Sequence, residues 1–154
     1  MIKRSLVDTY DESVEIYDEK TGITVGKLTR CIADSGEEEY LLNMYWDEYD
    51  KIPYADDIPG YDMDLRAEEY VRHDYTVFMT EYMPPPGRSN ARELMLSVGL
   101  DMKYDMWAFM VEQGRICQDY WRVKRIEGQV YAHDKYKIKR WLNKESVYEE
   151  LLIV

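Results

Sequence analysis

Three short segments near the start of the chain alternate between apolar and polar residues. They span residues 13–17, 23–32 and 40–46, and the stretches Asp18–Gly22 and Asp34–Glu37 between them each contain Asp and Gly. Alternation with a period of two residues is typical of a β-strand with one buried face, and short Gly-containing turns join antiparallel neighbours. The sequence therefore predicts an antiparallel meander of three strands.

The pattern changes at Asp47. From Asp47 to Asp64 the chain is rich in Pro, Gly and Asp, and Pro59 and Gly60 interrupt any regular element. This composition predicts a long acidic loop, and loops of this length in a compact domain are usually functional or partly disordered. A fourth strand is predicted over Thr76–Tyr82, because the prolines of Pro84–Gly87 would end it.

Helical patterns begin after this point. Asn90 and Glu93 have the spacing of a capping box, which predicts a helix that begins at Asn90 and ends at Gly99. A second short helix is predicted over Asp105–Gln113, where Gly114 provides the C-terminal cap.

The remaining segments predict further strands and a last helix. Arg115–Ile126 and Val130–Trp141 read as strands, and a helix is predicted to begin at Ser146. No linker or repeat separates these elements. The prediction is one α+β domain with an antiparallel sheet and short helices in the C-terminal half, in which an acidic β-rich part (about 8–82) precedes a mixed part (about 88–154).

Several functional classes are excluded by what the sequence lacks. No stretch approaches the ~18 apolar residues of a membrane span, and the first residues contain no apolar core of a secretion signal. Cys31 and Cys117 lie in strand-like segments and are interpreted as small core residues. His73 and His133 lack the spacing of a zinc motif. We therefore expect a cytoplasmic protein that does not bind membranes, is not an enzyme and needs no cofactor or metal.

Acidic runs offer oxygen atoms that hard cations prefer. Residues 37–39, 56–57 and 62–64 could ligate Mg²⁺ or Ca²⁺, but none has the twelve-residue spacing of an EF-hand loop. Dense like charges usually mark exposed or interacting segments. The prediction is a solvated acidic loop and no metal site.

Negative charge is concentrated in one half of the chain. Residues 8–81 contain 21 acidic and 6 basic residues, whereas residues 82–154 contain 10 acidic and 12 basic residues. An acidic surface repels phosphate, and non-specific binding to nucleic acid depends on basic residues. We therefore expect no direct binding to DNA or RNA and a basic, nucleic-acid-handling protein as the partner. The alternative is a small accessory interaction protein whose acidity only keeps it soluble.

Aromatic and acidic residues are interleaved in and around the predicted loop. Flat rings and rows of negative charge are what a nucleic-acid-binding groove receives, and aromatic anchors with a charged rim also describe protein interfaces. The predicted partner-binding residues are Trp46, Asp47, Glu48, Tyr49, Asp50, Tyr54, Asp56, Asp57, Tyr61, Asp62 and Asp64.

This charge layout resembles the acidic nucleic-acid mimics that phages and other mobile elements direct against bacterial defence, such as anti-CRISPR and antirestriction proteins. The resemblance implies a non-catalytic inhibitor or regulator that occupies the nucleic-acid-binding channel of a defence nuclease or a related protein. The basic segment Arg122–Lys144 departs from a purely acidic mimic.

A second resemblance points to an enzyme. Arg66, His73 and Tyr75 are similar in spacing to the Arg and His-x-Tyr elements of HEPN-type ribonucleases. This resemblance implies that Arg66 stabilises a phosphate and that His73 acts on the RNA 2′-hydroxyl, both from helices of a bundle. Because short motifs count only in their structural context, the ribonuclease is the less favoured hypothesis.

Overall fold

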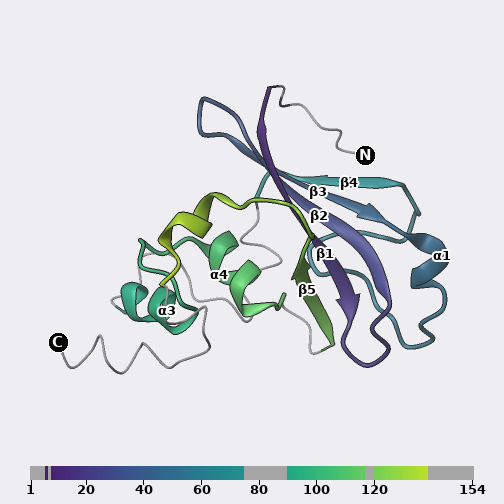
Figure 1. Ribbon diagram of the computed structural model, residues 1–154. Helices are drawn as coiled ribbons and strands as arrows, with labels where there is room; N and C mark the ends of the chain where they lie inside the picture. The colour runs from purple at the N-terminus through teal and green to yellow at the C-terminus, as the bar shows by residue number, and fades with distance from the viewer. Residues whose placement is uncertain (1–5, 7, 75–89, 117–119, 139–154) are drawn as a thin grey trace.

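The computed structural model describes residues 6, 8–74, 90–116 and 120–138. Five strands form one antiparallel sheet in the order β4-β3-β2-β1-β5 (Figure 1). The strands are β1 (Tyr10–Asp18), β2 (Thr24–Ile32), β3 (Glu38–Met44), β4 (Glu69–Arg72) and β5 (Trp121–Arg125). The helices are α1 (Trp46–Tyr49), α3 (Ala91–Ser97), α4 (Met106–Gln113) and the 3₁₀ helix η1 (Ala132–Tyr136). The predicted α+β fold class is confirmed.

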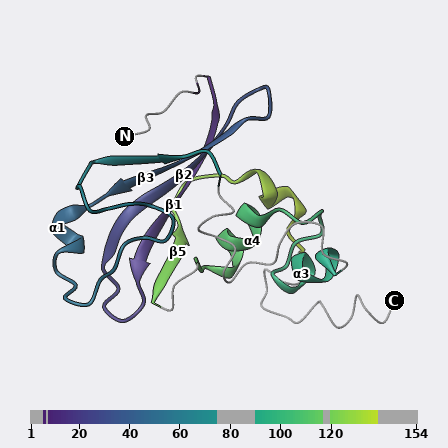
Figure 2. The ribbon, with the colours of Figure 1, turned by 180° about the vertical axis from the view of Figure 1, so that it is seen from behind.

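The helices lie at two ends of the sheet. Figures 1 and 2 show α3, α4 and η1 gathered on one side of the molecule and α1 on the opposite side, beyond the ends of β2 and β3. The helix α4 approaches the middle of the sheet, where the ring of Trp107 lies 6.1 Å from the ring of Tyr40 on β3.

The three-stranded meander predicted from the alternation is confirmed. Val14 of β1 pairs with Leu28 of β2, which pairs in turn with Leu42 of β3. Both connecting turns contain a glycine with positive φ, Gly22 at 75° and Gly36 at 90°. Glycine adopts this backbone conformation without the steric cost that a side chain would impose, which explains why the chain reverses at these two positions.

The fourth strand of the sheet is not the one predicted. β4 covers Glu69–Arg72 and pairs with β3 in antiparallel register, with Tyr70 opposite Leu42. The predicted strand Thr76–Tyr82 lies outside the described residues.

The fifth strand returns from the other half of the chain to the free side of β1. Val123 of β5 pairs with Ile16, and Trp121 pairs with Asp18. The predicted strand Arg115–Ile126 is confirmed in its second part, since β5 begins at Trp121.

The predicted strand Val130–Trp141 is wrong for the residues that the structure describes, because η1 occupies this position. The carboxylate of Asp134 accepts a hydrogen bond from the Tyr131 N–H at 3.0 Å, and the Asp134 N–H donates back to the Tyr131 carbonyl at 3.0 Å. These two bonds close a tight turn, which prevents Tyr131 from continuing in extended conformation.

The two predicted helices differ in how they begin. Asp105 caps α4 by accepting hydrogen bonds from Trp107 N–H (2.9 Å) and Ala108 N–H, and Gly114 ends the helix with a φ of 80°, as predicted. The Asn90 side chain makes no capping bond to α3, so the predicted capping box is wrong. The backbone of Asn90 (φ −102°, ψ 25°) is not in the extended conformation that directs a capping side chain at the helix.

Among the described residues, no helix is long and apolar enough to cross a membrane.

The core lies between the sheet and α4. Every residue of α4 from Met106 to Val111 is buried, together with Val14, Ile16 and Leu42 of the facing strands. The opposite face of the sheet carries a smaller buried cluster of Cys31, Leu41 and Val71. Cys31 is therefore a core residue, as predicted, whereas Cys117 lies outside the described residues.

The close approach of β2 and β3 requires a glycine at position 26. A Cβ atom added to Gly26 would lie 2.8 Å from the backbone oxygen of Asn43 and 3.3 Å from the sulfur of Met44. Backbone cannot yield as a flexible side chain does, so we expect Gly26→Ala to lower the free energy of unfolding by about 1–3 kcal/mol. Urea unfolding followed by circular dichroism measures the loss, and Glu127→Ala, at an exposed turn position without a positive φ, is the comparison. Equal stability of Gly26→Ala and the wild type would contradict the observed register.

Candidate functional site

The acidic loop, residues 47–64, is built onto the core by apolar side chains spaced along it. Ile52, Ile58 and Met63 are each 5% exposed or less, and Tyr61 is 5% exposed. Each buries its apolar surface in the main core cluster. The loop predicted to be solvated is therefore packed over much of its length, and this packing holds its carboxylates in defined positions.

Hydrogen bonds to the sheet hold the middle of the loop. The hydroxyl of Tyr54 donates to the carboxylate of Asp18, which is fully buried at the end of β1, and the Asp56 N–H donates to the hydroxyl of Tyr120 at 2.9 Å. Burial alone would raise the pKa of Asp18, but hydrogen bonds from Tyr54 and Thr21 lower it below its usual value. The hydrogen bond to Asp18 raises the pKa of Tyr54 to about 12, so that the phenol stays protonated and remains a donor at neutral pH.

Arg66 connects the end of the loop to α1. Its guanidinium donates to both carboxylate oxygens of Asp50, at 2.5 and 2.7 Å, and lies 4.5 Å from the centre of the Trp46 ring. The hydrogen bonds from Arg66 hold the pKa of Asp50 below its usual range. Glu48 likewise forms an ion pair with Lys51 at 2.9 Å. Glu48 and Asp50 are thus already neutralised within the molecule.

Three other carboxylates of the loop form an acidic cluster without such compensation. Oxygen atoms of Asp57, Asp62 and Asp64 all lie within 4.8 Å of one another, and all three residues are exposed. The structure shows no ion pair between these residues and any cation of the described chain; they accept only backbone hydrogen bonds, from Met63 N–H to Asp57 and from Asp64 N–H to Asp62. Like charges at this separation repel, so the cluster favours an added cation, either a metal ion or a basic side chain.

The structure divides the predicted partner-binding residues into two groups. The carboxylates of Asp47, Asp56 and the acidic cluster are exposed, as an interface would require. Three of the four predicted aromatic residues are not exposed: Tyr61 is buried, and Trp46 and Tyr49 pack against the core. A buried aromatic ring stabilises the fold more than an exposed one, because it removes a large apolar surface from water. These three rings therefore pack against the core. Of the four predicted anchors, Tyr54 is the most accessible, at 39%.

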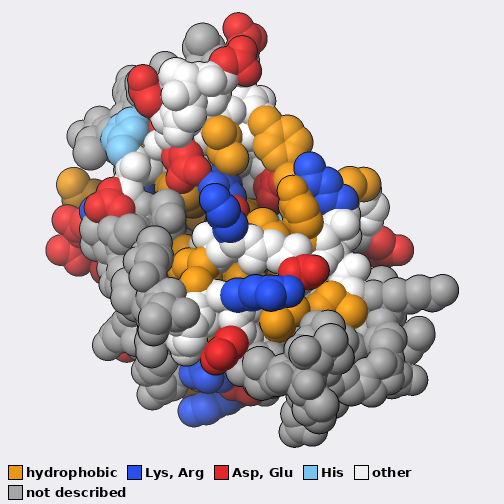
Figure 3. Space-filling view, turned by 90° about the vertical axis from the view of Figure 1, so that its left-hand side faces the viewer, with side chains coloured by type: hydrophobic (Ala, Val, Ile, Leu, Met, Phe, Trp, Pro, Cys, Tyr) orange, Lys and Arg blue, Asp and Glu red, His pale blue; other side chains and the backbone are white. Residues whose placement is uncertain are grey.

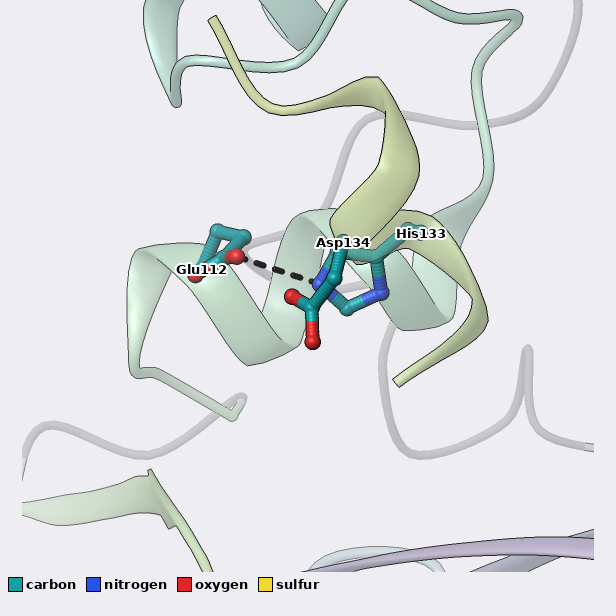
Figure 4. Close-up of side chains that lie close together, drawn as sticks. All are labelled: Glu112, His133 and Asp134. Carbon is teal, nitrogen blue, oxygen red and sulfur yellow. Dashed lines mark hydrogen bonds and ion pairs between the residues drawn. The ribbon is translucent and has the colours of Figure 1, made fainter. Parts of the chain in front are cut away.

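A second cluster of titratable groups joins α4, β5 and η1 (Figure 4). Glu112 accepts hydrogen bonds from His133 Nε2 (3.1 Å), Arg125 (3.1 Å) and Lys137 (2.9 Å), and Arg125 also donates to Asp134 at 2.6 Å. Burial would raise the pKa of Glu112, but the bonds from His133 and Lys137 lower it.

Glu112, His133 and Asp134 lie close enough together to hold a metal ion. Arg125 and Lys137 already occupy the positions of a cation between the two carboxylates, so the chemistry of this cluster is that of an internal ion-pair network. Sequence reasoning missed it, because Glu112 and His133 are separated by 21 residues and no local motif relates them.

The residues of the ribonuclease resemblance do not lie on helices. Arg66 is in the segment before β4 and is held by Asp50, and His73 follows β4 with its Nδ1 atom 3.8 Å from the buried carboxylate of Glu39. The helical setting implied by the resemblance is therefore wrong for both residues, and Tyr75 lies outside the described chain.

Comparison of the chain with protein-family models, with curated proteins and with solved structures found no match.

Proposed function

We propose that this protein is a non-catalytic binding protein whose acidic loop docks onto a basic surface of a nucleic-acid-handling protein and thereby inhibits or regulates it. The acidic half of the sequence favours a basic protein that handles nucleic acids as the partner. Defence nucleases are the best example of this class. The observation that carries the proposal is the acidic cluster of Asp57, Asp62 and Asp64, exposed and lacking a cationic partner in the described chain.

The anchoring of the loop supports this proposal. Clustered carboxylates on a disordered segment would separate to relieve their repulsion. Here the buried side chains of Ile58, Tyr61 and Met63 hold the backbone in place next to Asp57 and on both sides of Asp62. The repulsion is therefore present before binding, and basic side chains of a partner would relieve it. A preorganised charged surface loses little conformational freedom on binding and attracts an oppositely charged partner from a distance.

The test removes three charges while keeping the shape of the loop. Asparagine retains the side-chain oxygen that accepts the backbone bonds, so the triple variant Asp57→Asn, Asp62→Asn, Asp64→Asn should fold normally. Surface ion pairs contribute roughly 0.2–1 kcal/mol each, so we expect the variant to bind its partner about tenfold more weakly. Immobilised protein captures partners from a bacterial lysate, mass spectrometry identifies them, and the affinity of the purified partner is then measured for both proteins at several salt concentrations.

The matched control removes the same number of charges elsewhere. Asp34→Asn, Glu37→Gln and Glu127→Gln lie in exposed turns outside the loop and should leave binding unchanged. Capture of a nucleic-acid-binding protein that is released by salt, displaced by DNA or RNA and weakened only by the loop variant supports the proposal. A partner that binds both triple variants equally, or whose binding does not depend on salt, would show that the acidic loop is not the interface.

A further inference from the structure

The strand β4 forms one border of the sheet, and its outer side has no neighbouring strand among the described residues. Figures 1 and 2 show it at the edge of the sheet, away from α3 and α4. The Met44 N–H donates to the Glu68 carbonyl at 3.2 Å, in line with the register of the β3–β4 pair. Residues that bond to the neighbouring strand alternate along an antiparallel ladder. The backbone N–H and C=O groups of Tyr70 therefore point toward β3, and those of Glu69 and Val71 point away from it.

An apolar hollow lies beside this strand edge. Its volume is about 450 Å³, and its lining includes Tyr61, Ala67, Tyr70 and Val71. Leu65, which also lines the hollow, is 86% exposed and is the most exposed large hydrophobic residue of the described chain. An open strand edge is a template for pairing with another strand, and an exposed apolar surface beside it favours an interaction site.

The charges along this edge have opposite signs at its two ends. Glu68, just before β4, is exposed, and Arg72, its last residue, is partly exposed. Both side chains lie on the same face, because side chains alternate along a strand. Within the part of the chain that the structure describes, neither forms an ion pair. If a second copy pairs in antiparallel register centred on Tyr70, Glu68 of each copy lies opposite Arg72 of the other. Residues opposite one another have Cβ atoms about 4.5–5.5 Å apart, which is close enough for an ion pair.

On the side of the molecule toward α3, cations are matched within the chain instead. Arg92 lies 3.6 Å from Asp101, and Lys137 lies 2.9 Å from Glu112. Figure 3 shows this side, where Lys and Arg side chains lie among Asp, Glu and hydrophobic side chains. A cation with an internal partner must give it up to bind a second protein. The β4 edge, where Arg72 has no such partner among the described residues, is therefore the better docking surface.

We propose that β4 pairs with β4 of a second copy of this chain across a two-fold axis, in the antiparallel register centred on Tyr70. The outward backbone groups of Glu69 then bond to those of Val71 of the other copy, and the two sheets become continuous. Charges on an edge strand usually oppose such pairing. Here they favour it, because a two-fold interface must be self-complementary and the two ends of this edge carry opposite charges. This inference does not depend on the proposed function of the acidic loop.

Analytical ultracentrifugation of the full-length protein, from micromolar to millimolar concentration, tests whether the dimer forms. We expect a reversible equilibrium between monomer and dimer. Amide hydrogen exchange, followed by NMR, should slow with concentration at Glu69 and Val71 but not at Tyr70, whose N–H already points toward β3. A wild-type protein that stays monomeric over this range would show that the proposal is wrong.

Charge reversal tests the register. Arg72→Glu alone and Glu68→Arg alone should each weaken dimerisation about tenfold or more, because both symmetric ion pairs become contacts between like charges. An equimolar mixture of the two variants should dimerise as tightly as the wild type, since every facing pair in the mixed dimer again joins opposite charges. Mixing would not restore a variant that fails to fold, so this arm separates loss of the interface from loss of the structure.

Two control variants make the result specific. Arg92→Glu reverses an exposed charge on α3 and should leave dimerisation unchanged. The triple variant Asp57→Asn, Asp62→Asn, Asp64→Asn should dimerise at least as tightly as the wild type, because it removes like charges from both copies. The same variant is expected to bind the partner of the acidic loop more weakly, so the two proposals can fail separately. Dimers that neither charge reversal weakens, or that the mixture does not restore, would use a surface other than β4.

Discussion

Replacing Trp107 by alanine is expected to lower the free energy of unfolding by about 3–5 kcal/mol, the range for large aromatic side chains in a core. Trp107 is 1% exposed and is one of the largest fully buried side chains of the described chain. Its removal leaves a cavity beside Tyr40 of β3, and it also leaves the buried carboxylate of Glu12 without its indole donor. Urea unfolding followed by circular dichroism measures the loss.

A second substitution separates packing from hydrogen bonding at this position. Trp107→Phe keeps an aromatic ring against Tyr40 but removes the N–H that donates to Glu12. We expect it to cost less than Trp107→Ala by about 1–2 kcal/mol, since most of the apolar volume is retained. A stability loss below about 1 kcal/mol for Trp107→Ala would contradict the placement of α4 against the sheet.

Replacing Glu112 by glutamine is expected to lower the free energy of unfolding by about 2–3 kcal/mol. Glu112 accepts bonds from His133, Arg125 and Lys137, and the neutral amide no longer balances their charges. Removing one partner of a fully buried ion pair costs about 3–5 kcal/mol. We expect less here, because Arg125 keeps its bond to Asp134 and part of its side chain reaches solvent.

The same network predicts how stability depends on pH. The pKa values of Glu112 and Asp134 both lie below their usual values in the folded protein; burial would raise them, and the bonds from His133 and Lys137 to Glu112 and from Arg125 to Asp134 lower them. Below the unfolded pKa values the unfolded chain binds more protons than the native protein. The stabilisation is therefore fully present above the unfolded pKa values, near 4.5 for Glu112, and is lost as pH falls through the folded ones.

Chemical unfolding at a series of pH values tests this expectation. The wild type should lose stability between neutral and acidic pH more steeply than Glu112→Gln, because the variant has one less carboxylate with a lowered pKa. Glu127→Gln, in an exposed turn, is the control and should follow the wild type. Parallel pH profiles for the wild type and Glu112→Gln would show that the network does not stabilise the fold.

The parts of the fold that could be predicted are those whose signals are local. Alternation and glycine turns identify β1, β2 and β3, and a short helical segment that ends at Gly114 identifies α4. β4 was missed because Glu69–Arg72 is too short for a visible alternation and has acidic residues beside it. The strand predicted after Val130 was wrong because the carboxylate of Asp134 accepts a hydrogen bond from the Tyr131 N–H and closes a 3₁₀ turn there. An alternation of apolar and polar residues does not reveal such a bond.

The exposed carboxylates of the candidate site could be predicted from the sequence, but the buried side chains that hold the acidic loop in place could not. Aspartate side chains are usually exposed, so the residue type alone predicts that Asp57, Asp62 and Asp64 lie on the surface. Whether an aromatic ring between them faces solvent or the core depends on contacts with distant segments. Tyr61 illustrates this dependence, because its ring packs at 6.4 Å from Tyr70 of β4 and its hydroxyl donates to the carbonyl of Tyr40.

The pairing of β1 with β5 sets the order in which a newly made chain can assemble. The meander can form as soon as β3 is synthesised. One edge of β1 stays unpaired until Trp121–Arg125 is made, about a hundred residues after β1. At ~5–20 residues per second the wait is roughly 5 to 20 s. An open strand edge is a template for pairing with another chain, and charged side chains on the strand oppose such pairing. Glu15 lies on this part of β1, opposite Lys124 of β5, and we expect its charge to oppose such pairing until β5 is made.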